Sequence, residues 1–190
     1  MGLRNTPRRY GSLAMLFHWV LAAAVIFMLW FGIAMDSMAP DGRLLGLDQF
    51  AAYQLHKSIG FTILVLAVLR LAWRWIDPVP PLPNTLKGWE TWAAKITHVA
   101  LYLLLIAMPI VGWIMVSASP WQIPTVLYGV VELPHITGPS EQLEGAMIRL
   151  HATLGFVFIA VLVLHVMAAA KHHFVLKDDT LKRMLPGTQV

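Results

Sequence analysis

Two histidines, His151 and His165, lie fourteen residues apart within the apolar segment 146–170. An α-helix advances about 100° per residue, so fourteen residues bring the second side chain to within about 40° of the first. With a rise of about 1.5 Å per residue, the two imidazoles lie roughly 21 Å apart along one face. Ionisable side chains in a membrane-spanning helix are costly and usually functional. One such helix would present a nitrogen ligand near each end, as two haems stacked across a membrane require.

The composition indicates an integral membrane protein. The 190 residues are 58% hydrophobic and 13% charged, whereas a soluble domain carries about 25% charged residues. The absence of cysteine excludes disulfides, iron–sulfur clusters, thiolate ligation and the C-x-x-C-H attachment of a c-type haem. Any haem would then be b-type and held by histidine or methionine. We attribute the net charge of +4 to membrane topology and expect no nucleic acid partner.

Four apolar segments are long enough to cross about 30 Å of hydrocarbon. They cover approximately residues 15–35, 53–75, 92–117 and 146–170. They predict an all-α fold, a four-helix membrane bundle forming one domain over 1–190. The proline-rich linker 77–85 is expected to be extended. The segment 118–145 is too rich in proline to form a fifth span, and a short interfacial helix is expected near 140–145.

The distribution of basic residues predicts the orientation of the chain. Eleven Lys and Arg residues lie at the N-terminus, around the linker between the second and third spans, and in the C-terminal tail. Three lie on the other side: Arg43, Lys57 and Arg149. The positive-inside rule therefore places both termini in the cytoplasm. The first span is expected to be retained rather than cleaved as a leader, because its apolar core is long and contains His18.

Four of the eight histidines form two pairs matched by depth. His18 and His165 lie near the cytoplasmic level, and His56 and His151 lie near the outer level. Two pairs at two depths indicate two haem b groups, each held by two histidines. Two separate two-histidine sites would suit zinc poorly; a proton relay, another metal or simple packing are the alternatives. The remaining histidines outside the spans are expected to be solvated or to face lipid headgroups: His135, His172 and His173.

The second and fourth spans share the motif H-x-x-x-G-F, which begins at His56 and at His151. Gly60 and Gly155 lie one helical turn below these histidines, where a missing side chain leaves room for a flat macrocycle. A small-residue contact between helices is the alternative. The similarity ends at Arg70, where the fourth span has a second histidine. Arg70 is a candidate partner for a haem propionate or a quinone carbonyl, unless it only reaches the lipid headgroups.

Other polar residues near these levels are secondary candidates. Lys57 and Arg149 could pair with propionates of the outer haem or attract a small anion, or could be interfacial anchors. Lys95 and His98 lie one helical turn apart at the cytoplasmic level and are candidates, with Arg74, for binding a quinone headgroup. His98 is also weighed as a ligand or a packing residue. Pro109 is expected to kink the third span.

Several motifs together resemble the bacterial cytochrome b561 family over nearly the whole chain. They are R-x8-H-W at Arg9–Trp19, H-K-S-I-G at His56–Gly60, R-L-A-W-R at Arg70–Arg74, K-I-T-H at Lys95–His98, M-P-I-V-G-W at Met108–Trp113 and H-x13-H at His151–His165. The resemblance implies a four-helix protein of the bacterial inner membrane with two b-type haems. It also implies that His18 pairs with His165 and that His56 pairs with His151.

The family includes small stand-alone diheme proteins regarded as superoxide oxidases, and it is related to the cytochrome b subunits of formate dehydrogenases and hydrogenases. The expected function is therefore electron transfer from superoxide to ubiquinone, which would make the protein an oxidoreductase. The expected partners are membrane lipid, quinone and superoxide. One alternative is a membrane cytochrome b subunit that passes electrons between a partner redox subunit and quinone. Another is a non-haem transporter or a structural membrane protein. The loop 118–145 receives no role from the resemblance.

Overall fold

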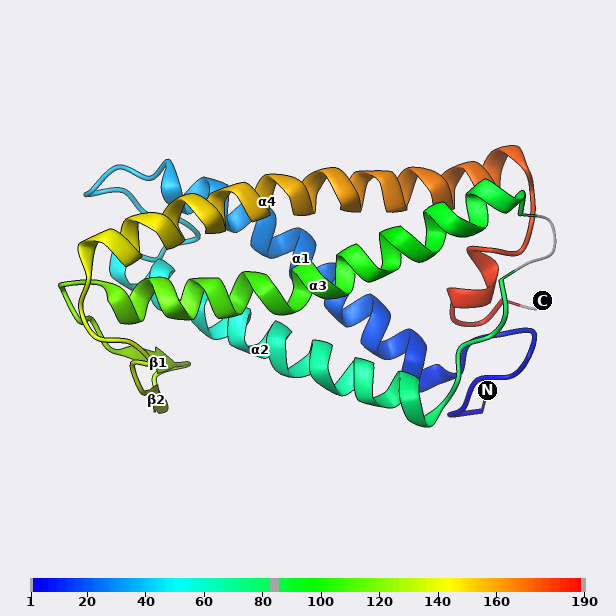
Figure 1. Cartoon of the computed structure of the whole chain (residues 1–190), viewed down its shortest axis with the longest axis horizontal. Coiled ribbons are helices and arrows are strands. Elements are labelled where there is room, and N and C mark those ends of the chain that lie inside the picture. The colour runs from blue at the N-terminus through cyan, green and yellow to red at the C-terminus, as the bar shows by residue number, and fades with distance from the viewer. Residues whose placement is uncertain (1, 83–85, 189–190) are drawn as a thin grey trace.

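Four long helices dominate the computed structural model, which describes residues 2–82 and 86–188. They are α1 (Ser12–Asp36), α2 (Gln49–Ile76), α3 (Gly88–Ala118) and α4 (Glu141–Ala170). All four are long and apolar enough to cross a membrane, which confirms the predicted spans. They run along the long axis of the molecule (Figure 1), and α1 packs on α2, α2 on α3 and α3 on α4. Each helix extends a few residues beyond the predicted boundaries.

The fourth helix begins five residues before the predicted span and ends at the predicted residue, Ala170. Ser140 caps it by accepting a hydrogen bond from the backbone N–H of Leu143, and Glu141 and Glu144 in the first turn complement the helix dipole. The separate interfacial helix expected near 140–145 is therefore the first turn of α4. Beyond Ala170 the chain continues as a π-helical turn, η1 (Lys171–Val175).

The loop between α3 and α4 contains a short antiparallel hairpin that was not predicted. It consists of β1 (Thr125–Leu127) and β2 (Val131–Leu133), with Thr125 opposite Leu133. The hairpin lies against α2, where Gln54 accepts from the Val126 N–H at 3.2 Å and Ser58 accepts from the Tyr128 N–H at 3.0 Å. The sequence signal for this docking is a polar stripe at four-residue spacing on α2, formed by Gln54, Ser58 and Thr62.

The N-terminal segment and the C-terminal tail lie at the same end of the molecule (Figure 1). Arg183 joins them, because its buried guanidinium donates to the carbonyls of Pro7, Arg8 and Pro81. The short 3-10 helix η2 (Lys182–Met184) carries this arginine. The linker is non-helical over 78–82, as predicted, and its 83–85 portion lies outside the described residues.

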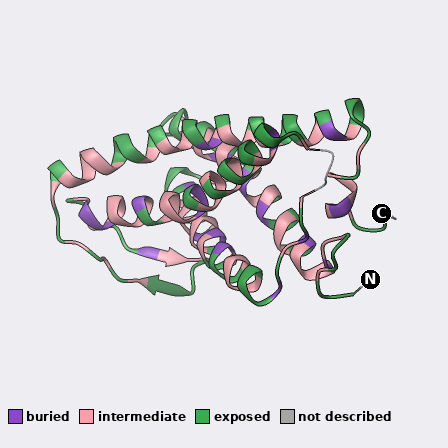
Figure 2. Ribbon diagram, turned by 45° about the vertical axis from the view of Figure 1, so that its right-hand side comes forward, coloured by how far each residue is buried: buried purple, intermediate pink, exposed green. Residues whose placement is uncertain are grey.

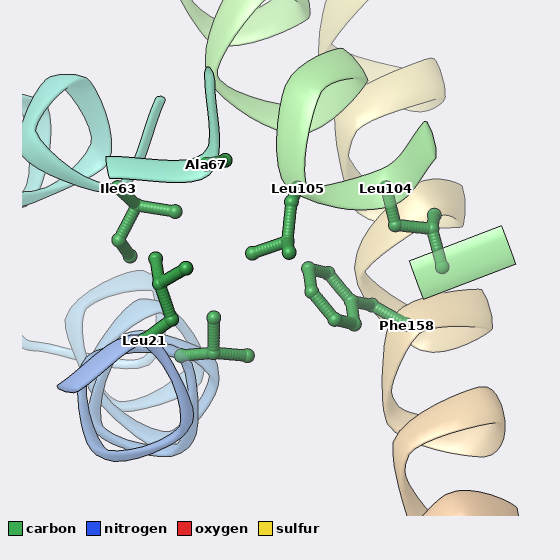
Figure 3. Close-up of a cluster of buried hydrophobic side chains, with 7 residues drawn as sticks. Leu21, Ile63, Ala67, Leu104, Leu105 and Phe158 are labelled. Atoms are coloured by element: carbon green, nitrogen blue, oxygen red, sulfur yellow. The ribbon is translucent and has the colours of Figure 1, made fainter. Parts of the chain in front are cut away.

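Between the two predicted histidine levels, all four helices contribute to one apolar layer. Leu21, Ile63, Leu105 and Phe158 belong to this buried cluster, and their side chains converge in Figure 3. The outward faces of the helices are largely exposed (Figure 2), which suits helices surrounded by lipid. The α3 helix continues unbroken through Pro109, and its two halves run in different directions in Figure 1, as expected of a proline kink.

Candidate haem sites

The first pair of histidines lies between α2 and α4, near the end of the bundle that carries the hairpin. The ring centroids of His56 and His151 are 6.2 Å apart, with their planes at 68°. A metal–imidazole bond is about 2 Å long, and the bonding nitrogen lies about 1 Å from the ring centroid. Two imidazoles on opposite sides of one metal ion therefore have centroids about 6 Å apart. The spacing of this pair fits a single iron atom held between the rings.

The second pair lies between α1 and α4, near the end that carries both termini. The ring centroids of His18 and His165 are also 6.2 Å apart, with their planes at 62°. Helix α4 thus contributes one member to each pair, while α1 and α2 contribute one each. Phe158 lies on α4 seven residues from His151 and seven from His165, within the apolar layer between the two pairs.

The residues present fit a haem better than a metal ion held by protein ligands alone. Within 2–82 and 86–188, no group of three or more His, Cys, Asp or Glu side chains could hold a metal ion. A macrocycle that supplies four equatorial nitrogens needs only two axial ligands from the protein. The buried Nδ1 atoms of His56 and His151 make no hydrogen bond of normal geometry to described residues, although the Met108 backbone interacts with the His151 ring.

Each histidine of the first pair, which the sequence predicts to be the outer pair, packs on a glycine of the preceding helix. A Cβ atom added to Gly32 would lie 3.4 Å from Cε1 of His56, and one added to Gly112 would lie 3.3 Å from Cε1 of His151. Sequence reasoning missed both glycines. At the glycines it did select, Gly60 and Gly155, an added Cβ would meet only methionine methyl groups, at 4.0 and 3.9 Å. Their role in leaving room for a macrocycle stays a prediction.

The second pair, predicted to be the inner pair, has polar neighbours that the first pair lacks. The guanidinium Nη2 of Arg70 lies 3.0 Å from Nδ1 of His18, and the His98 ring lies 5.5 Å from the His165 ring at 69°. Arg70 and Arg74 lie 5.5 and 5.8 Å from the centroid of the Tyr102 ring. Among the described residues neither arginine forms an ion pair. Arg70 therefore contacts a predicted ligand, which the sequence did not indicate.

Comparison with known proteins agrees with this arrangement. Residues 9–187 match the family model described as prokaryotic cytochrome b561. The chain belongs to this family. The cytochrome is 38% identical over 190 residues to cytochrome b561 homolog 2 of Escherichia coli strain K12, which covers 97% of this chain and 95% of the relative. It is 31% identical over 181 residues to the probable superoxide oxidase CybB of Yersinia pestis, covering 94% and 97%. Membership implies a membrane cytochrome that binds haem b.

The two cations that the sequence predicts on the outer side of the cytochrome, Lys57 and Arg149, have different surroundings. Lys57 is half-buried, and its ammonium donates to the carbonyl of Pro124 at 3.3 Å. Arg149 is exposed, and an added Cβ at Gly145 would meet its guanidinium at 3.6 Å. The segment before the hairpin thus holds the Lys57 ammonium, while the Arg149 guanidinium stays accessible.

The residues predicted to bind a quinone headgroup do not line one cavity. Lys95 is exposed, and its Nζ lies 5.2 Å from the Trp92 ring centroid. It lines a shallow apolar groove of about 370 Å³ on the exposed surface of α3. His98 faces inward, toward His165. Arg74 is exposed beside Tyr102. The structure therefore separates Lys95, on an exposed face of α3, from His98, Arg70 and Arg74.

One histidine outside the spans does not behave as predicted. His172 is 6% exposed, and its Nδ1 lies 2.6 Å from Oδ2 of Asp178. Burial alone would raise the pKa of Asp178, but hydrogen bonds from Thr180 and His172 hold that pKa below its usual value. The prediction that His172 is solvated was wrong, because the chain after η1 turns back and covers it. His135 and His173 are half-buried.

Proposed function

We propose that this cytochrome holds two haem b groups and carries electrons across the membrane, from superoxide at its outer end to ubiquinone at its inner end. The observation that supports this most strongly is the repeated ring separation of 6.2 Å in two histidine pairs at two depths. The haems, when bound, supply the one-electron chemistry, and the protein supplies position, electrostatics and exclusion of water. Two superoxide anions each give up one electron and become dioxygen. One ubiquinone gains both electrons and two protons.

The histidines hold and separate the two centres. His56 and His151 are the proposed ligands of the outer haem, and His18 and His165 those of the inner haem. Helix α4 fixes the separation along the membrane normal, at roughly 21 Å for fourteen residues. The apolar layer around Phe158 keeps water out of the space between the two sites.

The outer end suits a small anionic donor. Lys57 and Arg149 place two positive charges near the outer pair, on a side with few other basic residues. A positively charged surface raises the local concentration of an anion and the rate at which the anion encounters the protein. The relative in Yersinia pestis that is named a probable superoxide oxidase supports the choice of superoxide.

The inner end suits a quinone acceptor. His98, Arg70 and Arg74 offer hydrogen-bond donors for quinone carbonyls near the inner pair, and Tyr102 offers a flat apolar wall. The groove beside Lys95 is a candidate approach from the lipid phase. We place this end, with both termini, on the cytoplasmic side, because most basic residues gather there.

Rapid mixing of the purified, oxidised protein with superoxide tests the proposal. We expect haem reduction at a rate that falls with ionic strength, because screening weakens the attraction of an anion to Lys57 and Arg149. Added ubiquinone should then reoxidise the haem. No reduction, or a rate independent of salt, would contradict superoxide as the donor. Reduction only by a copurifying redox subunit would favour the role of a cytochrome b subunit in a larger complex.

A further inference from the structure

All four helices take part in an internal repeat. Helices α1 and α3 share the motif H-x9-M-x3-G at an offset of eighty residues, with His18, Met28 and Gly32 matching His98, Met108 and Gly112. Helices α2 and α4 share H-x3-G-F at an offset of ninety-five residues, with His56 and Gly60 matching His151 and Gly155. The chain therefore consists of two related helical hairpins, α1–α2 and α3–α4.

Matched residues make matched contacts, so the repeat extends to the packing. Gly32 approaches His56 as Gly112 approaches His151, with added-Cβ distances of 3.4 and 3.3 Å. Gly60 approaches Met28 as Gly155 approaches Met108, at 4.0 and 3.9 Å. In the apolar layer, Val25 matches Leu105 and Ile63 matches Phe158, and all four side chains lie in the same buried cluster.

At the outer level the repeat is intact, since the paired histidines His56 and His151 are equivalent residues. At the inner level it is broken. The offset of ninety-five residues makes Arg70 the equivalent of His165, and the offset of eighty makes His98 the equivalent of His18. The pair with the ligand spacing is nevertheless His18 with His165, which are not equivalent. Each of them has a polar neighbour from its own helical hairpin. Nη2 of Arg70 lies 3.0 Å from Nδ1 of His18, and the ring centroids of His98 and His165 are 5.5 Å apart.

We propose that position 70 is a ligand position of the repeat that arginine now occupies, and that Arg70 instead places a positive charge beside His18, which makes the inner haem the easier of the two to reduce. This inference rests on the proposed binding of two haems. The guanidinium Nη2 of Arg70 lies 3.0 Å from Nδ1 of His18, so it places a cation directly beside this proposed ligand. Arg70 is also permanently charged.

The positive charge of Arg70 predicts which haem has the higher midpoint potential. Reduction adds one electron, and a nearby positive charge outside bulk water stabilises the state that holds it. Hydrogen bonding to an axial ligand and local charge are both known determinants of haem potential. The histidines of the outer pair have no cation in contact with their Nδ1 atoms among the described residues. Electrons would then move downhill from the outer to the inner site.

Replacing the ligand tests the position. His18→Ala should bind only the outer haem. The double variant His18→Ala/Arg70→His should regain a second haem, because position 70 would pair with His165 as His56 pairs with His151. The readout is haem per chain in purified protein, together with the low-spin bis-histidine spectrum. A double variant that binds the outer haem normally but stays at one haem per chain would overturn the inference about position 70.

Potentiometric titration tests the charge. A His56→Ala background should retain only the inner haem. In that background, Arg70→Gln should shift the reduction equilibrium of the inner haem at least tenfold toward the oxidised form, which lowers its midpoint potential by about 59 mV for one electron. Arg70→Lys should recover part of the shift. Arg74→Gln is the matched control, since it removes an exposed charge beside the same Tyr102 ring without touching His18, and should change the equilibrium less than threefold.

Equal shifts for Arg70→Gln and Arg74→Gln, or no shift for either, would overturn the charge effect. If Arg70→Gln loses the inner haem and Arg70→Lys restores it, the need for a positive charge beside His18 stands. If Arg70→Lys does not restore that haem, the charge effect is overturned. The double variant His18→Ala/Arg70→His then decides whether position 70 is a ligand position. A wild-type protein with fewer than two haems would instead defeat the proposed function itself. The two failures are thus distinguishable.

Discussion

The outer and inner ends of α4 carry histidine pairs with the same ring separation in different surroundings. At the outer end, His56 and His151 pack on glycines and are equivalent residues of the repeat. At the inner end, His18 and His165 are not equivalent, and Arg70 and His98 stand beside them. Ligand type alone would give two similar haems. The neighbours of the ligands provide the difference that a directional electron carrier needs.

The largest effect is expected from removing a single ligand. His56→Ala should abolish the outer haem and His165→Ala the inner haem, so each variant should bind one haem per chain. The remaining haem should keep the midpoint potential it has in the wild type, because an apolar layer separates the sites. Haem extraction and redox titration of both variants check this. Loss of both haems from either variant would show that the two sites do not form independently.

A smaller effect is expected from filling the space behind the outer ligands. In Gly112→Ala the new methyl group would lie 3.3 Å from Cε1 of His151, so the ring must shift by a few tenths of an ångström. Overpacking of this kind costs about 1–3 kcal/mol. We expect weaker retention of the outer haem and an unchanged inner haem, measured by haem loss to apomyoglobin. Gly145→Ala is the matched control on α4, since its new methyl would meet only the flexible end of Arg149 at 3.6 Å.

Neutralising the outer cations should change kinetics without changing haem content. Lys57→Gln/Arg149→Gln should slow haem reduction by superoxide several-fold at low salt, because fewer positive charges attract the anion. The wild-type and variant rates should converge at high salt. Stopped-flow reduction at several ionic strengths measures both effects. A variant that reacts as fast as the wild type at low salt would remove these residues from the donor site.

The smallest effect is expected at the tail, which closes the inner end and has no counterpart at the outer end. The pKa of Asp178 is lowered in the folded protein by hydrogen bonds from Thr180 and His172, so these contacts stabilise the fold above the unfolded pKa of about 3.9. That contribution is lost as the pH falls through the folded pKa. Asp178→Asn should cost up to about 1 kcal/mol at neutral pH, and the difference from the wild type should shrink as the pH falls toward the folded pKa. Thermal unfolding in detergent at pH 7 and pH 3 checks this.

The sequence predicted the features that depend on hydropathy and helical periodicity. The four spans follow from the length of the apolar segments. The location of His151 and His165 on one helix face follows from their spacing of fourteen residues. Contacts between helices were less predictable. The glycines Gly32 and Gly112 lie on the helix that precedes the histidine each one touches, and only the packing of the helices shows that contact. The hairpin on α2 was missed because its strands have three residues each, too few to show an alternating pattern. His172 was misassigned because its burial depends on the path of the tail.

The most direct test of the account is a redox titration of the purified wild-type protein, with haem quantified per chain. We predict two b-type haems per chain, which titrate as two one-electron components, with the higher potential assigned to the inner haem by the His56→Ala and His165→Ala variants. One haem per chain, or none, would contradict the central claim that the two histidine pairs form two haem sites.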